Sequence, residues 1–146
     1  MTRTPLQLAA TVVGAVFLLV GVLGFIPGIT THYGDLSFAG HHSDAKLLGI
    51  FEVSVLHNIV HLLFGVAGIA LARTYDGARN FLIGGGVIYL ALFLYGVIFG
   101  ADEGGANWIP VNWADNILHL ALGAGMIVTG LALAREVRER RTAPAV

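Results

Sequence analysis

Ionisable side chains lie within two of the most apolar stretches of this chain. His57 and His61 are four residues apart in one stretch, and Asp115 and His119 have the same spacing in the other. Residues four apart share one face of an α-helix, about one turn apart. Because titratable groups at membrane depth are expensive and usually mark a function or a buried pair, these residues are the first candidates for chemistry.

Three kinds of chemistry fit this spacing, and the residues leave all three open. His61 and His119 could ligate haem b from two helices, with Gly65 and Gly123 one turn below making room for a porphyrin. A transition metal such as zinc, copper or non-haem iron would suit a set of nitrogen and oxygen ligands. Its ligands would be His57, His61, Asp115 and His119. The third is a proton relay, since imidazole titrates near neutrality.

A purely structural role is the alternative for the same residues. His57 would pair with Asp115, and Asn58 and Asn116 would form polar pairs with the histidines between helices, fixing how two hairpins dock. Asn112 lies three residues before Asp115, a spacing that predicts a capping box at the start of a helix. Under this interpretation the polar groups hold helices together and bind nothing.

The elements that position these residues follow from composition. Of the 146 residues, 56% are hydrophobic and 12% charged, with a mean hydropathy of +0.80. Four apolar stretches of membrane-spanning length run over about 6–29, 47–72, 81–100 and 111–134. Four strands cannot close a barrel in lipid, so each stretch is predicted to be a helix. The fold class is an all-α membrane protein in a single domain, and the second span would hold Glu52 near its outer end, close to Lys46.

Basic residues indicate the orientation of these spans. Seven of the eight fall before the first span, between the second and third, or after the fourth, and Lys46 lies on the opposite side. The positive-inside rule makes the arginine-rich side cytoplasmic. We therefore expect a multi-pass protein of the cell (plasma) membrane with both ends in the cytoplasm, including a tail over residues 135–146.

The two halves of the chain resemble copies of one helical hairpin. Residues 57–65 resemble residues 115–123, which aligns the polar residues of the two stretches, and a second match aligns Gly21 with Gly96. Each hairpin would start and end in the cytoplasm. The copies would then form a parallel bundle related by a pseudo-two-fold axis along the membrane normal.

Several function classes are excluded by the same composition. The chain has no cysteine, so it cannot form disulfides, thiolate metal sites or iron–sulfur clusters. Its formal net charge of -1 provides no basic surface for nucleic acid. The expected partners are the lipid bilayer and a homo-oligomer or larger membrane complex.

Three longer segments carry a family resemblance. Residues 24–30, 47–62 and 107–120 resemble the actinobacterial four-helix integral membrane family known as domain of unknown function 4383, over roughly residues 6–134. The resemblance implies the four-helix topology and supplies no activity, cofactor or site. We therefore expect a non-enzymatic membrane protein whose paired histidine motif docks the hairpins or binds a ligand. The alternatives are a redox membrane subunit holding haem b or a metal, and a component of proton or small-solute transport.

Overall fold

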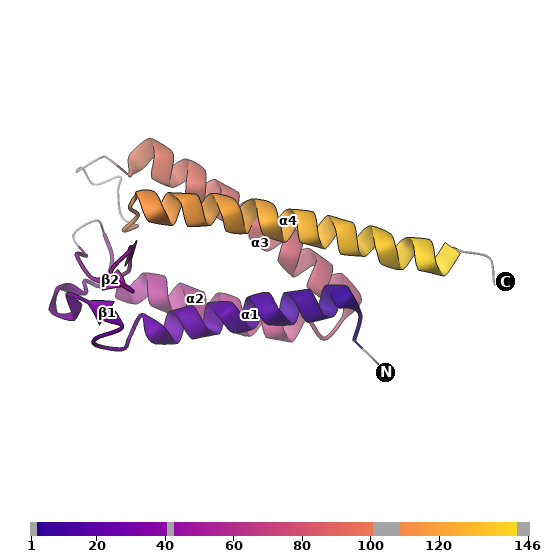
Figure 1. Ribbon diagram of the computed structural model, residues 1–146, viewed down its shortest axis with the longest axis horizontal. Helices are drawn as coiled ribbons and strands as arrows, with labels where there is room; N and C mark the ends of the chain where they lie inside the picture. The colour runs from indigo at the N-terminus through magenta and orange to yellow at the C-terminus, as the bar shows by residue number, and fades with distance from the viewer. Residues whose placement is uncertain (1–2, 41–42, 101–108, 143–146) are drawn as a thin grey trace.

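Four α-helices make up most of the described part of the chain, with a short 3-10 helix over Tyr33–Asp35. The computed structural model describes residues 3–40, 43–100 and 109–142, with side chains described as far as residue 135. The helices are α1 (Pro5–Leu23), α2 (Val55–Leu71), α3 (Tyr75–Phe99) and α4 (Trp113–Thr142). α1 packs along α2, and α3 packs along α4, which gives two hairpins (Figure 1). α1 begins and α4 ends at the same end of the molecule.

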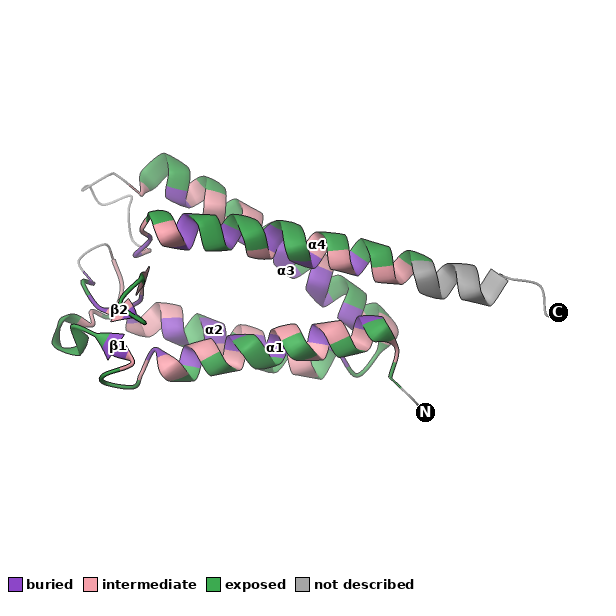
Figure 2. Ribbon diagram, viewed as in Figure 1, coloured by how far each residue is buried: buried purple, intermediate pink, exposed green. Residues whose placement is uncertain are grey.

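The helices have the length and apolar surface of a membrane protein. α1, α3 and residues Trp113–Arg135 of α4 are long and apolar enough to cross a bilayer, and α2 is an apolar helix of 17 residues. Exposed positions recur along all four helices (Figure 2), and many of them hold large aliphatic residues. Leu63 and Val128, for example, are each 65% exposed. Since such faces are stable only against lipid, the predicted all-α membrane class is confirmed.

Each helix begins at a polar residue whose side chain accepts a hydrogen bond from the first turn. These residues are Thr4, Ser54, Thr74 and Asn112. The predicted capping box at the fourth helix is confirmed, because the Asp115 backbone N–H donates to Asn112 Oδ1 at 3.0 Å and Asn112 N–H donates to Asp115 Oδ2 at 3.0 Å. α4 continues past the apolar stretch to Thr142, as the alternating charges of the tail suggest.

Three predicted boundaries are wrong. α1 ends at Leu23, not at residue 29, and the Thr30 hydroxyl donates to the carbonyls of Leu23 and Gly24. α3 begins at Tyr75, not at residue 81. α2 begins at Val55 and not at residue 47, because residues 46–47 and 51–52 form two strands joined by a turn. Glu52 therefore lies outside the helix that was expected to hold it.

A small antiparallel sheet connects α1 to α2. It contains β1 (Thr30–Thr31), β2 (Lys46–Leu47) and β3 (Phe51–Glu52), in the order β1-β2-β3. The register places Glu52 directly opposite Lys46. Burial raises the pKa of the Glu52 carboxyl, an effect that Lys46 partly opposes. The sheet escaped prediction because each strand has two residues and no alternating pattern to reveal it.

The turn between β2 and β3 contains a strained residue. Leu48 has φ 55° and Gly49 has φ 72°, and Leu48 is 62% exposed. Hairpin turns with positive φ at both central positions favour Asn-Gly, since a bulky side chain is strained in this region.

Replacing Leu48 with asparagine is therefore expected to raise the free energy of unfolding by about 1 kcal/mol. Thermal unfolding of the purified protein in detergent measures the change. Ile50→Asn is the matched control, because Ile50 is 52% exposed and lacks a positive φ. An equal or larger gain in the control would contradict the assignment of strain to Leu48.

Candidate functional site

In each hairpin a buried asparagine packs against a glycine. A Cβ at Gly24 would collide with the Asn58 amide, and one at Gly96 would collide with the Asn116 amide. Both asparagines are almost fully buried. They pack within their own hairpins, so the expectation that they dock one hairpin on the other is wrong. By these contacts the counterpart of Gly96 in the first hairpin is Gly24. The sequence alignment had paired Gly96 with Gly21, which lies one helical turn earlier.

Further contacts recur in the two hairpins. A Cβ at Gly65 would lie 2.7 Å from Gly14 O, and one at Gly86 would lie 2.7 Å from Gly123 O. The two hairpins therefore bring their helices together at similar small-residue contacts.

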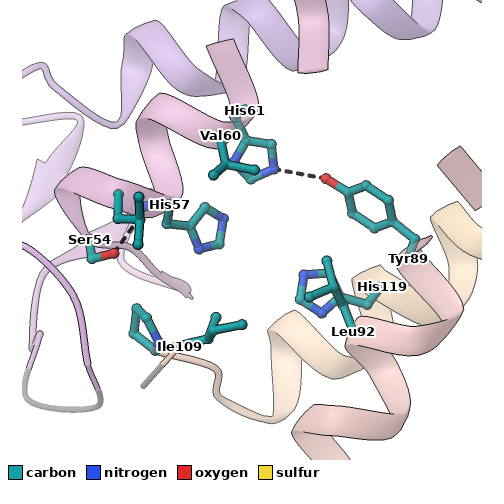
Figure 3. A pocket seen from close by; sticks show the side chains of 10 residues that line it. Ser54, His57, Val60, His61, Tyr89, Leu92, Ile109 and His119 are labelled. Carbon is teal, nitrogen blue, oxygen red and sulfur yellow. Dashed lines mark hydrogen bonds between the residues drawn. The ribbon is translucent and has the colours of Figure 1, made fainter. Parts of the chain in front are cut away.

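The predicted histidines converge between the hairpins around a tyrosine. The rings of His57 and His61 on α2 are 4.4 Å apart between centroids. His61 Nε2 lies 3.1 Å from the Tyr89 hydroxyl, and the Tyr89 ring meets the His119 ring edge-to-face at 5.4 Å (Figure 3). Tyr89 thus lies between the two histidines that were expected to face each other. We call His57, His61, Tyr89 and His119 the central cluster.

Tyr89 is the functional candidate that the sequence analysis missed. It lies in the middle of α3 and is 5% exposed. A phenol near the centre of an apolar span is the signal that could have found it, because a buried tyrosine hydroxyl usually needs a partner. Phe17 stacks on His61 at 5.5 Å between ring centroids and closes the cluster on the α1 side.

Two polar atoms of the central cluster have no partner. The Nδ1 atoms of His61 and His119 make no hydrogen bond to any part of the chain that the structure describes, and both have almost no accessible surface. Burying an unsatisfied polar group costs about 1–3 kcal/mol. The cluster therefore retains two unused hydrogen-bonding atoms inside an apolar region.

Asp115 takes no part in this cluster. Its Oδ2 accepts the backbone N–H of Glu52 at 3.1 Å and that of Asn112 at 3.0 Å. Asn112 Nδ2 donates to the Ile50 carbonyl at 2.7 Å. We call these bonds, which join α4 of the second hairpin to β3 and the turn of the first, the outer clamp.

The predicted pairing of His57 with Asp115 is therefore replaced by bonds to the backbone. Within residues 3–40, 43–100 and 109–135, no three or more His, Asp or Glu side chains are placed to hold a metal ion. The four candidate metal ligands all line the second cavity described below, but they are not placed to hold an ion, because the Asp115 carboxylate accepts the backbone N–H groups of Glu52 and Asn112.

Two cavities adjoin the central cluster, and all four of its residues line both. The first has a volume of about 160 Å³ and lies between α2, α3 and the start of α4. The second has a volume of about 300 Å³ and lies between α1, the outer sheet and α4. Figure 3 shows His57 and His119 on opposite sides of the first cavity. Volumes of this size suit a small molecule or the head of a larger one.

Comparison with known proteins identifies the family of the chain. The family model described as Domain of unknown function (DUF4383) matches residues 7–132, a range that includes the central cluster and the outer clamp. Comparisons with curated proteins and with solved structures gave no match. Because the matched range is most of the chain, this protein belongs to the family described as Domain of unknown function (DUF4383).

Proposed function

We propose that this protein is a non-enzymatic integral membrane protein that binds a ligand between its two hairpins. The observation that carries the proposal is the convergence of His57 and His61 from one hairpin with Tyr89 and His119 from the other on two shared cavities. Ligand sites are typically apolar pockets with a few placed polar groups.

The state of the polar atoms favours binding over a purely structural role. If the cluster served to dock the hairpins alone, its polar atoms would be expected to pair with one another. His61 and Tyr89 do pair, and this bond contributes to docking. The Nδ1 atoms of His61 and His119 have no such partner in the described chain, which a purely structural role leaves unexplained, and a small turn of either ring would present this atom to a ligand.

The proposed setting is the cell membrane, with both ends in the cytoplasm. The shared end of α1 and α4 supports equal placement of the two ends, and the arginine distribution supports the cytoplasmic side. The recurring glycine contacts support two related hairpins about an axis along the membrane normal.

Haem b is a second candidate ligand, favoured by the position of His61 and His119 on different hairpins. His61 Nε2 is occupied by the Tyr89 hydroxyl, and His61 Nδ1, although it has no partner in the described chain, has almost no accessible surface. Ligation would require that bond to break or the ring to turn, which makes this candidate the weaker of the two.

Native mass spectrometry of the purified protein tests the proposed function. We expect wild-type protein to carry a bound small molecule of discrete mass, and the double variant Tyr89→Phe/His119→Phe to lose about nine-tenths of it, which corresponds to a loss of affinity of at least about tenfold. His32→Asn is the control, since this exposed histidine of the outer loop has φ 49°, which asparagine tolerates.

An absorption spectrum and elemental analysis of the same sample identify the ligand class. A Soret band lost in His61→Phe and His119→Phe would favour haem b over the proposed organic ligand. Ligand binding would be contradicted if wild-type protein carried no bound molecule, haem or metal. Its spectra would then be the same as those of the Tyr89→Phe/His119→Phe variant.

A further inference from the structure

We infer that the ligand is a neutral, lipid-soluble molecule with an apolar tail and a head bearing carbonyl or hydroxyl oxygens, and that it enters sideways from the bilayer. This inference rests on the proposed function, because it concerns the same central cluster. It adds the chemical class of the ligand and its route.

The openings of both cavities lie on the lipid-facing flanks. Leu56, Val60 and Leu92 line the first cavity between α2 and α3, and Val60 is 50% exposed. Val16 lines the second between α1 and α4 and is 49% exposed. These side chains belong to apolar helices whose outer faces meet lipid, so each opening leads to the hydrocarbon phase.

The outer ends of the cavities are covered by the loops. Ile109 and Pro110 line the outer end of the first cavity. Leu47 and Val53 line the outer end of the second cavity and are 4% and 1% exposed. The outer clamp holds this loop against α4. Leu48, which is 62% exposed, also lines the second cavity from this loop. We infer that a molecule dissolved in lipid reaches the cavities beside Val60 and Val16 more readily than water reaches them through the loops.

The lining of the cavities selects a neutral head. Among the residues that line them, the sole Asp, Glu, Lys or Arg of the described chain is Asp115, whose carboxylate already accepts two backbone hydrogen bonds. A charged head would be buried without a counter-ion, which is costly. The imidazoles of His57 and His119 line both cavities and can bond a neutral oxygen instead: a carbonyl oxygen accepts from a protonated ring nitrogen, and a hydroxyl can also donate to an unprotonated one.

The cavity sizes agree with a molecule that is only partly enclosed. About 160 Å³ and 300 Å³ suit a head group, and neither cavity is sealed. A tail would leave through the opening beside Val60 or Val16 and remain among lipid chains. The protein would thus need to enclose little more than the oxygen-bearing head.

Photolabelling in phosphatidylcholine vesicles tests this inference on the full-length protein. The probe is a benzoquinone with a ten-carbon chain that carries a diazirine, and mass spectrometry locates the label. We expect the label on peptides that contain Val60, Leu92 or Val16. Val60→Trp and Val16→Trp combined should lower labelling about tenfold, because tryptophan fills both openings. Val66→Trp is the control, since Val66 is 58% exposed on α2 and lines neither cavity.

A competition experiment separates the inference from the proposed function. The same benzoquinone without its chain should compete at least about tenfold more weakly than the chain-bearing form, since it lacks the lipid-dissolved tail. If both compete equally and the tryptophan variants label normally, the ligand reaches the cluster from water and lateral entry is wrong. If wild-type protein is not labelled at the cavity and carries no bound molecule, the proposed function fails as well.

Discussion

Valine in place of Gly65 is expected to cost at least about 3 kcal/mol of the free energy of unfolding. A Cβ at this position would lie 2.6 Å from Leu18 N and 2.7 Å from Gly14 O, which are backbone atoms of α1. Backbone cannot swing aside as a side chain can, so α1 and α2 would have to separate. In lipid, close packing of small residues is the main attraction between helices, and separation removes it.

Thermal unfolding followed by circular dichroism in detergent measures this loss. Gly125→Val is the matched control, because a Cβ at Gly125 meets nothing within 4 Å. Gly123→Val tests the corresponding place in the second hairpin. Its Cβ would meet the Leu90 side chain at 2.8 Å before Gly86 O at 3.0 Å, so we expect a smaller loss. Equal stabilities of the Gly65 and Gly125 variants would show that the close approach of α1 and α2 is wrong.

Alanine in place of Asp115 is expected to cost about 3 kcal/mol, because it leaves the Glu52 and Asn112 backbone N–H groups without an acceptor. Asp115→Asn should cost less, since an amide oxygen can still accept. Asp35→Ala is the control, because Asp35 is exposed and lies, like Glu52, in the segment between α1 and α2. Urea titration in detergent compares the three variants, and a loss in Asp35→Ala as large as that in Asp115→Ala would contradict the assigned role.

Asp115→Ala should also open the second cavity to water. The chain has no cysteine, so Val53→Cys introduces a single thiol at a position that is 1% exposed. We expect a membrane-impermeant maleimide to react with this thiol at least about tenfold faster when Asp115 is alanine, because the loop that the clamp holds is released. If the maleimide reacts at the same rate whether residue 115 is aspartate or alanine, the outer clamp does not close the second cavity.

Local pattern was enough to predict the helices and part of the site. The apolar stretches reveal four helices because a span in lipid must be long, apolar and internally hydrogen-bonded. The capping box of Asn112 and Asp115 is a contact between residues three apart, which spacing alone specifies. The shared face of His57 and His61 follows in the same way, and their rings do meet.

The partners of these residues were decided by tertiary structure. Spacing could not show that Asp115 bonds to the backbone of Glu52, because the two lie 63 residues apart and meet only when the hairpins dock. Nor could it place Tyr89 between His61 and His119, since that depends on where α3 passes the other helices. Hydropathy and helical period act within one element, whereas a cavity between hairpins depends on the shape with which separate elements pack.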